Sequence, residues 1–133
     1  MRLIIGMSGA SGVIYGIRLL EVLSRVEQVE THLVLSNSAK LNIAIETDRN
    51  AKEVQDLADE VYSNKDIAAR LASGSFKTDG MIVAPCAVKT LSAIANSYAD
   101  SLLVRAADVV LKERRRLVLV PRETPLHTGH CEL

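Results

Sequence analysis

The chain has 133 residues, the length of one ordinary domain, and 48% of them are hydrophobic, which is enough for a buried core. Its 16 basic and 16 acidic side chains cancel, so no basic excess supports binding to nucleic acid. No apolar stretch approaches the roughly 18 residues of a membrane-spanning helix, and the apolar run near the N-terminus is too short for a signal peptide. With no Trp, three Tyr and one Phe, the core must be aliphatic, which suits a sheet buried on both faces.

The first predicted element is a strand at residues 3–5, followed by Gly6, Gly9 and Gly12 and by a helix from residue 13. A glycine turn between a strand and a helix brings backbone N–H groups and the helix dipole against a phosphate. The spacing is not Gly-x-Gly-x-x-Gly, and no Lys-Ser/Thr pair follows, so neither the dinucleotide fingerprint nor a Walker A loop is present. Ser8 and Ser11 add hydroxyls for a ligand. The alternative is a tight packing turn with no ligand.

The remaining pattern alternates between helix and strand. It predicts helices at 13–24, 39–45, 51–57, near 67–71, at 89–95 and at 102–113, and strands at 31–35, near 61, at 80–84 and at 117–120. Pro85 and Pro121 are expected to end the last two strands. This order predicts an α/β fold with three layers, Rossmann-like or flavodoxin-like, around a mainly parallel sheet, as a single domain over residues 1–133.

Ligands bind at the carboxyl ends of the strands in such sheets. The loops there are residues 6–12, 36–38, 85–90 and 121–125. Dinucleotide-binding folds place an acid after the second strand, but this chain has Ser36-Asn37-Ser38, which favours a mononucleotide such as FMN over NAD. The alternative for Ser36 is an ordinary helix N-cap.

Several cations could meet a phosphate. Lys89 and Thr90 begin a predicted helix, where a lysine is disfavoured by the helix dipole unless an anion is bound; the alternative is a solvated first turn. Arg122 follows the last strand, where a guanidinium suits a phosphate; the alternative is a surface ion pair with Glu123. Lys112 lies one helical turn after Asp108 and is a candidate to face inward.

The two cysteines form no disulfide framework, and a reduced cytoplasmic setting is therefore expected. Cys86 has no histidine near it in the sequence and is read as a small buried hydrophobe rather than a nucleophile. His127, His130 and Cys131 resemble a metal cluster only superficially, so no metal is expected.

Taken together, these motifs resemble the UbiX-type flavin prenyltransferases, within the homo-oligomeric FMN-binding, decarboxylase-like flavoproteins. The resemblance covers essentially the whole chain. It rests on the segments Gly-Met-Ser-Gly-Ala-Ser-Gly (6–12), Ser36 with Glu46-Thr47, Ala-Pro-Cys (84–86) with Lys89-Thr90-Leu91, Arg-Ala-Ala-Asp-Val-Val-Leu-Lys-Glu-Arg (105–114) and Leu-Val-Leu-Val-Pro-Arg-Glu-Thr-Pro-Leu-His (117–127).

The resemblance implies a transfer of the dimethylallyl group of dimethylallyl phosphate to N5 and C6 of reduced FMN, without metal. FMN would lie between subunits, and its prenylated form would serve a partner UbiD-type decarboxylase. The implied FMN contacts are Gly9, Ala10, Ser11, Ser36, Ala87, Val88, Lys89, Thr90 and Arg122. The implied catalytic residues are Ser11, Glu46, Lys112 and Glu123, with Arg105 and Lys112 at the substrate phosphate.

The sequence departs from the family pattern after His130. The family continues with a Leu-rich helix, another strand and a segment with a tyrosine and a basic residue that hold the prenyl phosphate, whereas Cys131-Glu-Leu133 follow here. Without that further strand the last predicted strand would lose a neighbour, so we expect it to expose an apolar surface. Two alternatives to prenyl transfer stay open: an FMN-dependent decarboxylase of aromatic acids or cysteine, and an FMN-binding protein without catalysis.

Overall fold

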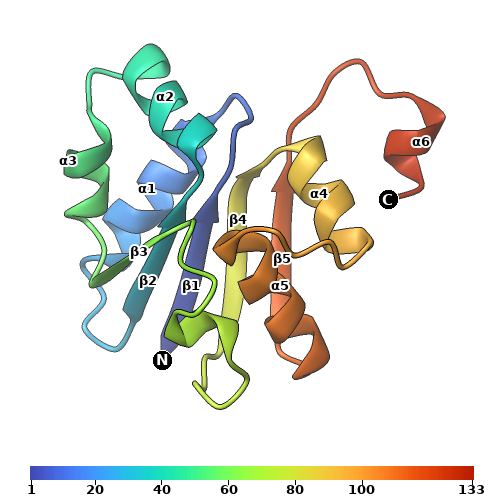
Figure 1. Cartoon of the computed structure of the whole chain (residues 1–133). Helices are drawn as coiled ribbons and strands as arrows, with labels where there is room; N and C mark the ends of the chain where they lie inside the picture. Colours follow the sequence, from blue (N-terminus) through green and yellow to red (C-terminus); the bar gives the residue numbers. More distant parts are fainter.

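A computed structural model describes all residues, 1–133, as an alternation of strands and helices (Figure 1). The strands are β1 (Arg2–Met7), β2 (Glu30–Leu35), β3 (Glu60–Ser63), β4 (Gly80–Cys86) and β5 (Arg116–Pro121). The helices are α1 (Val13–Leu23), α2 (Asn37–Glu46), α3 (Ala51–Gln55), α4 (Val88–Ala95), α5 (Leu102–Lys112) and α6 (Thr128–Cys131), with a short 3₁₀ helix, η1 (Arg70–Ala72).

The five strands form one parallel sheet in the order β3-β2-β1-β4-β5. Ile4 in β1 is in register with His32 in β2 and with Met81 in β4. The chain builds outward from β1 to β3 and then crosses to β4 on the other side of β1. The strand order therefore reverses between β1 and β4, the place where open α/β sheets bind ligands.

Two hydrophobic cores cover the two faces of the sheet, so the predicted three-layer α/β fold is confirmed. One core joins β1 and β2 to α1, α2 and α3, and the other joins the opposite side of the sheet to α4, α5 and η1. Both are almost entirely aliphatic, as the composition predicts. Helix α1 lies close on the sheet, since a Cβ on Gly16 would meet the carbonyl oxygen of Ala84 at 2.3 Å.

The structure differs from the predicted elements in three places. Pro85 lies inside β4, which continues to Cys86, because β4 carries an irregularity between Val83 and Cys86 where proline is tolerated. Pro121 is the last residue of the edge strand β5, as expected. The helix expected near 67–71 is wrong: only η1 forms there, and the exposed Ile67 has no core to face. Helix α6 was not predicted.

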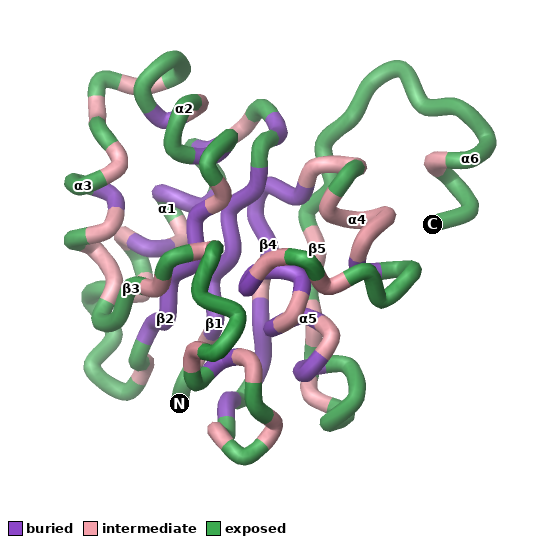
Figure 2. The backbone as a smooth tube through the Cα atoms, in the orientation of Figure 1, coloured by how far each residue is buried: buried purple, intermediate pink, exposed green.

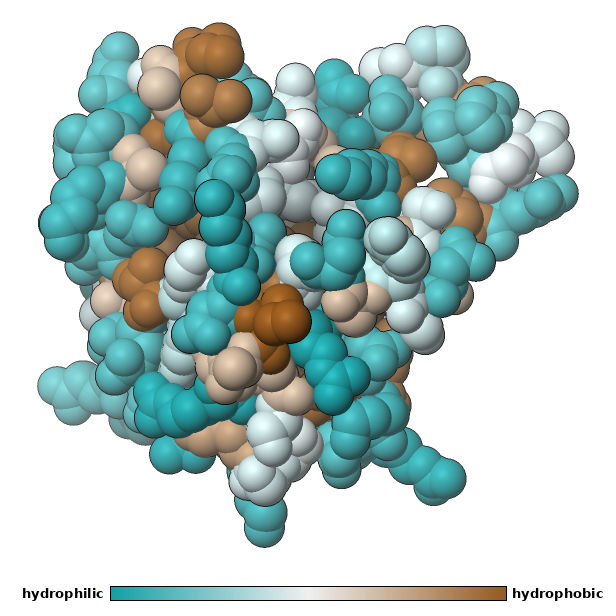
Figure 3. All heavy atoms as spheres, in the orientation of Figure 1, coloured by the Kyte–Doolittle hydropathy of each residue, from teal (hydrophilic) through white to brown (hydrophobic).

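The predicted exposure of the last strand is confirmed. Figure 2 shows β1, β2 and β4 mostly buried, while β5 alternates between half-buried and exposed residues. Val118 and Val120 keep 43% and 37% of their surface exposed. None of the helices has the length and apolar character needed to cross a bilayer. The face in Figure 3 is mostly hydrophilic, with hydrophobic side chains in small separate groups.

Candidate functional site

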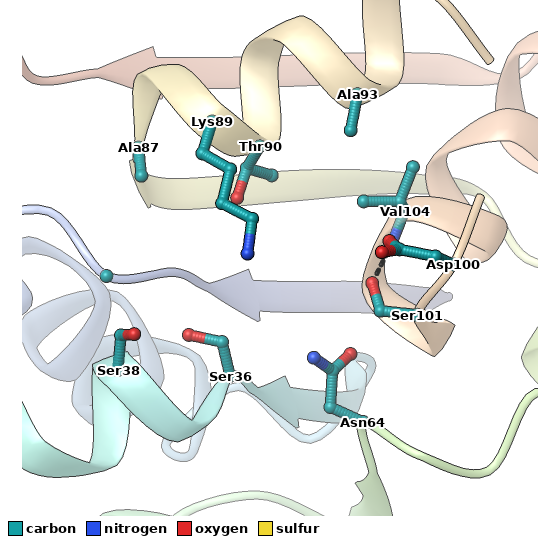
Figure 4. A pocket seen from close by; sticks show the side chains of 11 residues that line it. Ser36, Ser38, Asn64, Ala87, Lys89, Thr90, Ala93, Asp100, Ser101 and Val104 are labelled. Carbon is teal, nitrogen blue, oxygen red and sulfur yellow. Dashed lines mark hydrogen bonds between the residues drawn. The ribbon is translucent and has the colours of Figure 1, made fainter. Parts of the chain in front are cut away.

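A pocket of about 260 Å³ opens at the carboxyl ends of the strands, beside the place where the strand order reverses (Figure 4). Of the loops expected there, three meet in it. Five of the predicted FMN contacts line it: Gly9, Ser36, Ala87, Lys89 and Thr90. Sequence reasoning therefore located the pocket, and contact of these residues with FMN stays a prediction.

Ser8 is a structural residue, and the interpretation of its hydroxyl as a ligand contact is wrong. The side chain is 1% exposed. Its Oγ donates to the carbonyl oxygen of Pro85 at 3.1 Å and accepts the N–H of Ala87 at 2.7 Å. The hydroxyl thus joins the ends of β1 and β4, the two strands that flank the pocket.

The N-terminus of α4 is the strongest anion-binding feature of the pocket. Ala87 precedes the helix and no side chain caps it, so the N–H groups of its first turn remain free for a ligand. Figure 4 shows the side chain of Lys89 extending from this turn into the pocket, and Thr90 beside it. A free helix N-terminus and an ammonium group together favour a phosphate.

Serines from α2 form the facing wall. The Oγ of Ser36 accepts the N–H of Ala39 at 3.0 Å, so Ser36 is the predicted N-cap and a pocket residue at once. Its own hydroxyl hydrogen remains available to a ligand. Ser38 packs so closely on the glycine loop that a Cβ on Gly9 would meet its Cβ at 2.3 Å.

These observations fit the phosphate end of FMN. At this end the pocket offers free backbone N–H groups, the ammonium of Lys89 and the hydroxyls of Ser36 and Ser38, all of which can donate hydrogen bonds to phosphate oxygens. The close contact of Gly9 with Ser38 leaves no space for a side chain between the loop and the helix.

The other predicted FMN contacts lie around this pocket rather than in its lining. Ala10 is buried, and its carbonyl oxygen accepts from Asn42 at 3.3 Å. Ser11 is exposed at the tip of the glycine loop, and Val88 is half-buried at the start of α4. Arg122 reaches the site through its backbone, since its N–H donates to the carbonyl oxygen of Cys86 at 3.1 Å, directly before Ala87.

One predicted catalytic residue also meets the glycine loop. The Oε1 of Glu46 accepts the N–H of Gly12 at 2.9 Å, next to Ser11. Gly12 has a φ of 99°, a conformation that favours glycine, and it begins α1 without a side-chain cap. The carboxylate of Glu46 therefore occupies a backbone donor at a helix N-terminus, the kind of position that also suits an anionic ligand.

The remaining predicted residues lie outside the pocket of the single chain. Arg105 pairs with Asp108 at 3.6 Å on α5. Lys112 pairs with Glu113 at 2.8 Å at the other end of that helix, half-exposed, so the expectation that it faces inward is wrong. That contact lowers the pKa of Glu113. Glu123 is exposed and accepts the N–H of Thr124 at 3.0 Å.

Three polar residues of the pocket were missed by sequence reasoning: Asn64, Asp100 and Ser101. Asn64 directly follows β3, so it lies at the carboxyl end of a strand, like the loops that the sequence did predict. The short, half-exposed β3 gave too weak a pattern to fix its end. Asp100 and Ser101 precede α5, where Ser101 is the N-cap.

Cys86 is fully buried, and burial raises the pKa of its thiol to about 11. The thiol is therefore neutral near pH 7, which agrees with the interpretation as a small hydrophobe. His127 and His130 cap α6, because the Nδ1 of each accepts the backbone N–H of the other at 3.2 and 3.3 Å. No group of three or more His, Cys, Asp and Glu side chains is arranged to hold a metal ion.

Comparison with known proteins gives a consistent result. A family model described as "Flavoprotein" matches residues 1–128. The flavin prenyltransferase UbiX of Escherichia coli K12 is 61% identical over 132 residues, which cover 99% of this chain and 70% of that protein.

Two solved structures share the fold closely. A dodecameric FMN-dependent UbiX-like decarboxylase from Escherichia coli O157:H7 superposes with a TM-score of 0.98 at 56% identity, over 99% of this chain and 72% of that one. AnUbiX (PadA1), solved in complex with FMN and dimethylallyl pyrophosphate, superposes with a TM-score of 0.96 at 52% identity, over 98% of this chain and 69% of that one.

Proposed function

The chain belongs to the flavoprotein family, and from that premise we propose that it is a flavin prenyltransferase, which transfers a dimethylallyl group from dimethylallyl phosphate to N5 and C6 of reduced FMN. The observation that carries this proposal is the 61% identity to a UbiX flavin prenyltransferase across 99% of the chain. The phosphate-binding character of the pocket supports it independently.

FMN, when bound, supplies the two atoms that receive the prenyl group. The chain's own residues bind and orient it: the first turn of α4, Lys89 and Ser36 hold phosphate oxygens, and the glycine loop gives close backbone approach. Arg122 adds a cation from the end of β5. Donors fixed before the ligand arrives stabilise charge without a cost of reorganisation during the reaction.

The remaining predicted residues move protons and stabilise charge during the transfer. Ser11 assists removal of the proton at C6. Glu46 and Glu123 are the carboxyl groups that can exchange a proton with the departing phosphate, and Arg105 and Lys112 stabilise its negative charge. Arg105, Lys112 and Glu123 lie outside the pocket of one chain, and we propose that a neighbouring subunit brings them to it in a homo-oligomer.

We also propose a use for the prenylated FMN and a cellular location for the protein. Prenylated FMN would be passed to a UbiD-type decarboxylase. A cytoplasmic location is inferred from the two unpaired cysteines.

Incubation of the protein with reduced FMN and dimethylallyl phosphate, followed by the mass of the flavin, tests the proposal. The expected result is a flavin that has gained one dimethylallyl group. Unchanged flavin in the presence of bound FMN would refute prenyl transfer. A release of CO₂ from an aromatic acid or a cysteine peptide by the FMN-loaded protein would then support a decarboxylase, and inertness toward all of these a binding protein.

A further inference from the structure

Asn64 connects the end of β3 to the start of α5. Its carbonyl oxygen accepts the N–H of Leu102 at 2.9 Å, and its side-chain Oδ1 accepts the N–H of Leu103 at 2.8 Å. The Oγ of Ser101 accepts the next N–H, that of Val104, at 3.3 Å. The first N–H groups of α5 are therefore all satisfied within the chain, in contrast to those of α4.

These contacts fix which way the amide of Asn64 faces. Because Oδ1 is held by a backbone N–H, the assignment of the two amide atoms is fixed, and Nδ2 lies at the opposite edge of the same planar amide. Figure 4 shows it directed into the pocket, on the side of Ser36. No atom of the chain accepts a hydrogen bond from Nδ2, so two donors are presented to whatever fills the pocket.

The charges of the pocket indicate which part of a ligand these donors meet. Lys89 and the free N-terminus of α4 lie along one wall, and Asp100 lies with Ser101 at one end (Figure 4). A phosphate is attracted to the cationic wall and repelled by the carboxylate of Asp100. The end that contains Asn64, Asp100 and Ser101 therefore suits the uncharged polar part of a nucleotide.

We propose that Asn64 is a flavin-binding residue, whose Nδ2 donates a hydrogen bond to an uncharged oxygen of FMN, a ribityl hydroxyl or a ring carbonyl, while its Oδ1 stays on Leu103. The proposal rests on the proposed function, since it takes FMN as the ligand. It gives Asn64 two separable tasks, one for the fold and one for the ligand.

The substitution Asn64→Asp separates these tasks. Aspartate keeps an oxygen for the N–H of Leu103, at a helix N-terminus where a negative charge is favoured, but it has no donor for the ligand. We expect thermal stability to stay within about 2 °C of the wild type. We expect the dissociation constant of FMN, measured by flavin fluorescence, to rise about 10-fold, the effect of one lost hydrogen bond.

Two controls distinguish the loss of a hydrogen bond from the effect of the added negative charge. The ratio of the two dissociation constants is measured at about 0.05 M and about 0.5 M salt, because repulsion between the new carboxylate and the FMN phosphate is screened by salt whereas a lost hydrogen bond is not. Asn64→Ala removes the donor without adding charge and should also weaken FMN binding; it removes the acceptor of the Leu103 N–H as well, so it should lower thermal stability.

Equal affinity of Asn64→Asp and wild type, or a loss of affinity that disappears at high salt, would overturn the proposal. If Asn64→Asp is unstable, unchanged FMN affinity in Asn64→Ala would overturn the proposal. Failure of the wild type to bind FMN would instead overturn the proposed function and this inference with it. Binding of FMN by the wild type without prenyl transfer would refute the proposed reaction alone.

Discussion

Glu46, in the last turn of α2, holds the N–H of Gly12 across the glycine loop at 2.9 Å. One helical turn earlier, Asn42 donates to the carbonyl oxygen of Ala10 at 3.3 Å. The same face of α2 thus fixes the backbone on both sides of Ser11. The position of the serine proposed to assist proton removal depends on a helix that is far from it in the sequence.

Glu46→Gln should separate the positioning role of this side chain from its chemistry. Glutamine can still accept the N–H of Gly12, so FMN affinity should stay within about 3-fold of the wild type. A proton donor or acceptor is lost, and prenyl transfer should slow by about 100-fold or more. Single-turnover formation of prenylated FMN measures this, and a rate equal to the wild type would remove Glu46 from the proton transfer.

Ser8→Ala and Ser11→Ala form a matched pair in one loop. Ser8→Ala leaves the part-buried N–H of Ala87 without its partner and should lower the free energy of unfolding by about 1–3 kcal/mol. Ser11 is exposed, so Ser11→Ala should change stability by less than about 0.5 kcal/mol. We expect Ser11→Ala to bind FMN normally and to prenylate it slowly. Urea titrations measure the stability of each variant, and turnover assays measure its rate of prenylation. A Ser11→Ala protein that is less stable than Ser8→Ala would contradict the structural role of Ser8 and the catalytic role of Ser11.

Arg122→Ala should weaken FMN binding by about 10-fold or more, since a hydrogen bond to a charged phosphate is worth more than a neutral one. Arg116→Ala is the control, because Arg116 begins the same strand and lies at its opposite end. Flavin titration of both variants is the measurement. The same affinity in the two variants would remove Arg122 from the phosphate site.

Cys86 should resist alkylation in the native protein. Burial raises the pKa of its thiol to about 11, so it stays protonated between pH 7 and 9, while Cys131 is exposed. Iodoacetamide at pH 8 should therefore add one label, at Cys131, and a second only after unfolding. Peptide mass spectrometry locates the labels, and rapid native labelling of Cys86 would show an accessible thiol.

Glu30 should make stability depend on pH. The hydrogen bond from His32 holds the pKa of the Glu30 carboxyl below 4.5, its value in an unfolded chain. A lowered pKa in the folded state means that the stabilisation is present above about pH 4.5 and is lost as the pH falls through the folded value. Glu30→Gln should accordingly melt below the wild type at pH 6, and the gap should narrow at pH 3. A gap that widens in acid would contradict this.

The fold followed from the sequence wherever an apolar run and a breaker occurred together. Residues 3–5 before three glycines, and residues 117–120 before Pro121, were each found within two residues of the strands observed. The helix expected near 67–71 did not form because only Leu71 packs into a core, whereas Ile67 is exposed, a difference that tertiary packing determines. Pro85 was expected to end β4 but lies inside it, because the register shift between Val83 and Cys86 makes a proline tolerable there.

The site was predictable to the extent that it depends on strand ends. The glycine loop, Ser36 and Lys89 were found in that way, and the chain brings them into one pocket. Asn64 was missed because nothing in its residue type distinguishes it from other asparagines. Its importance comes from the N–H of Leu103, whose place beside the end of β3 only the packing of α5 determines.

The hydroxyl of Ser8 has a consequence for motion. It accepts the amide hydrogen of Ala87 between the glycine loop and the start of α4, and Ser8 itself is 1% exposed. That amide can exchange with deuterium only when the ends of β1 and β4 separate. The rate at which the Ala87 amide exchanges therefore measures how often the two sides of the pocket separate. A ligand that bridges the two sides would slow this exchange, and its own dissociation would be slow for the same reason.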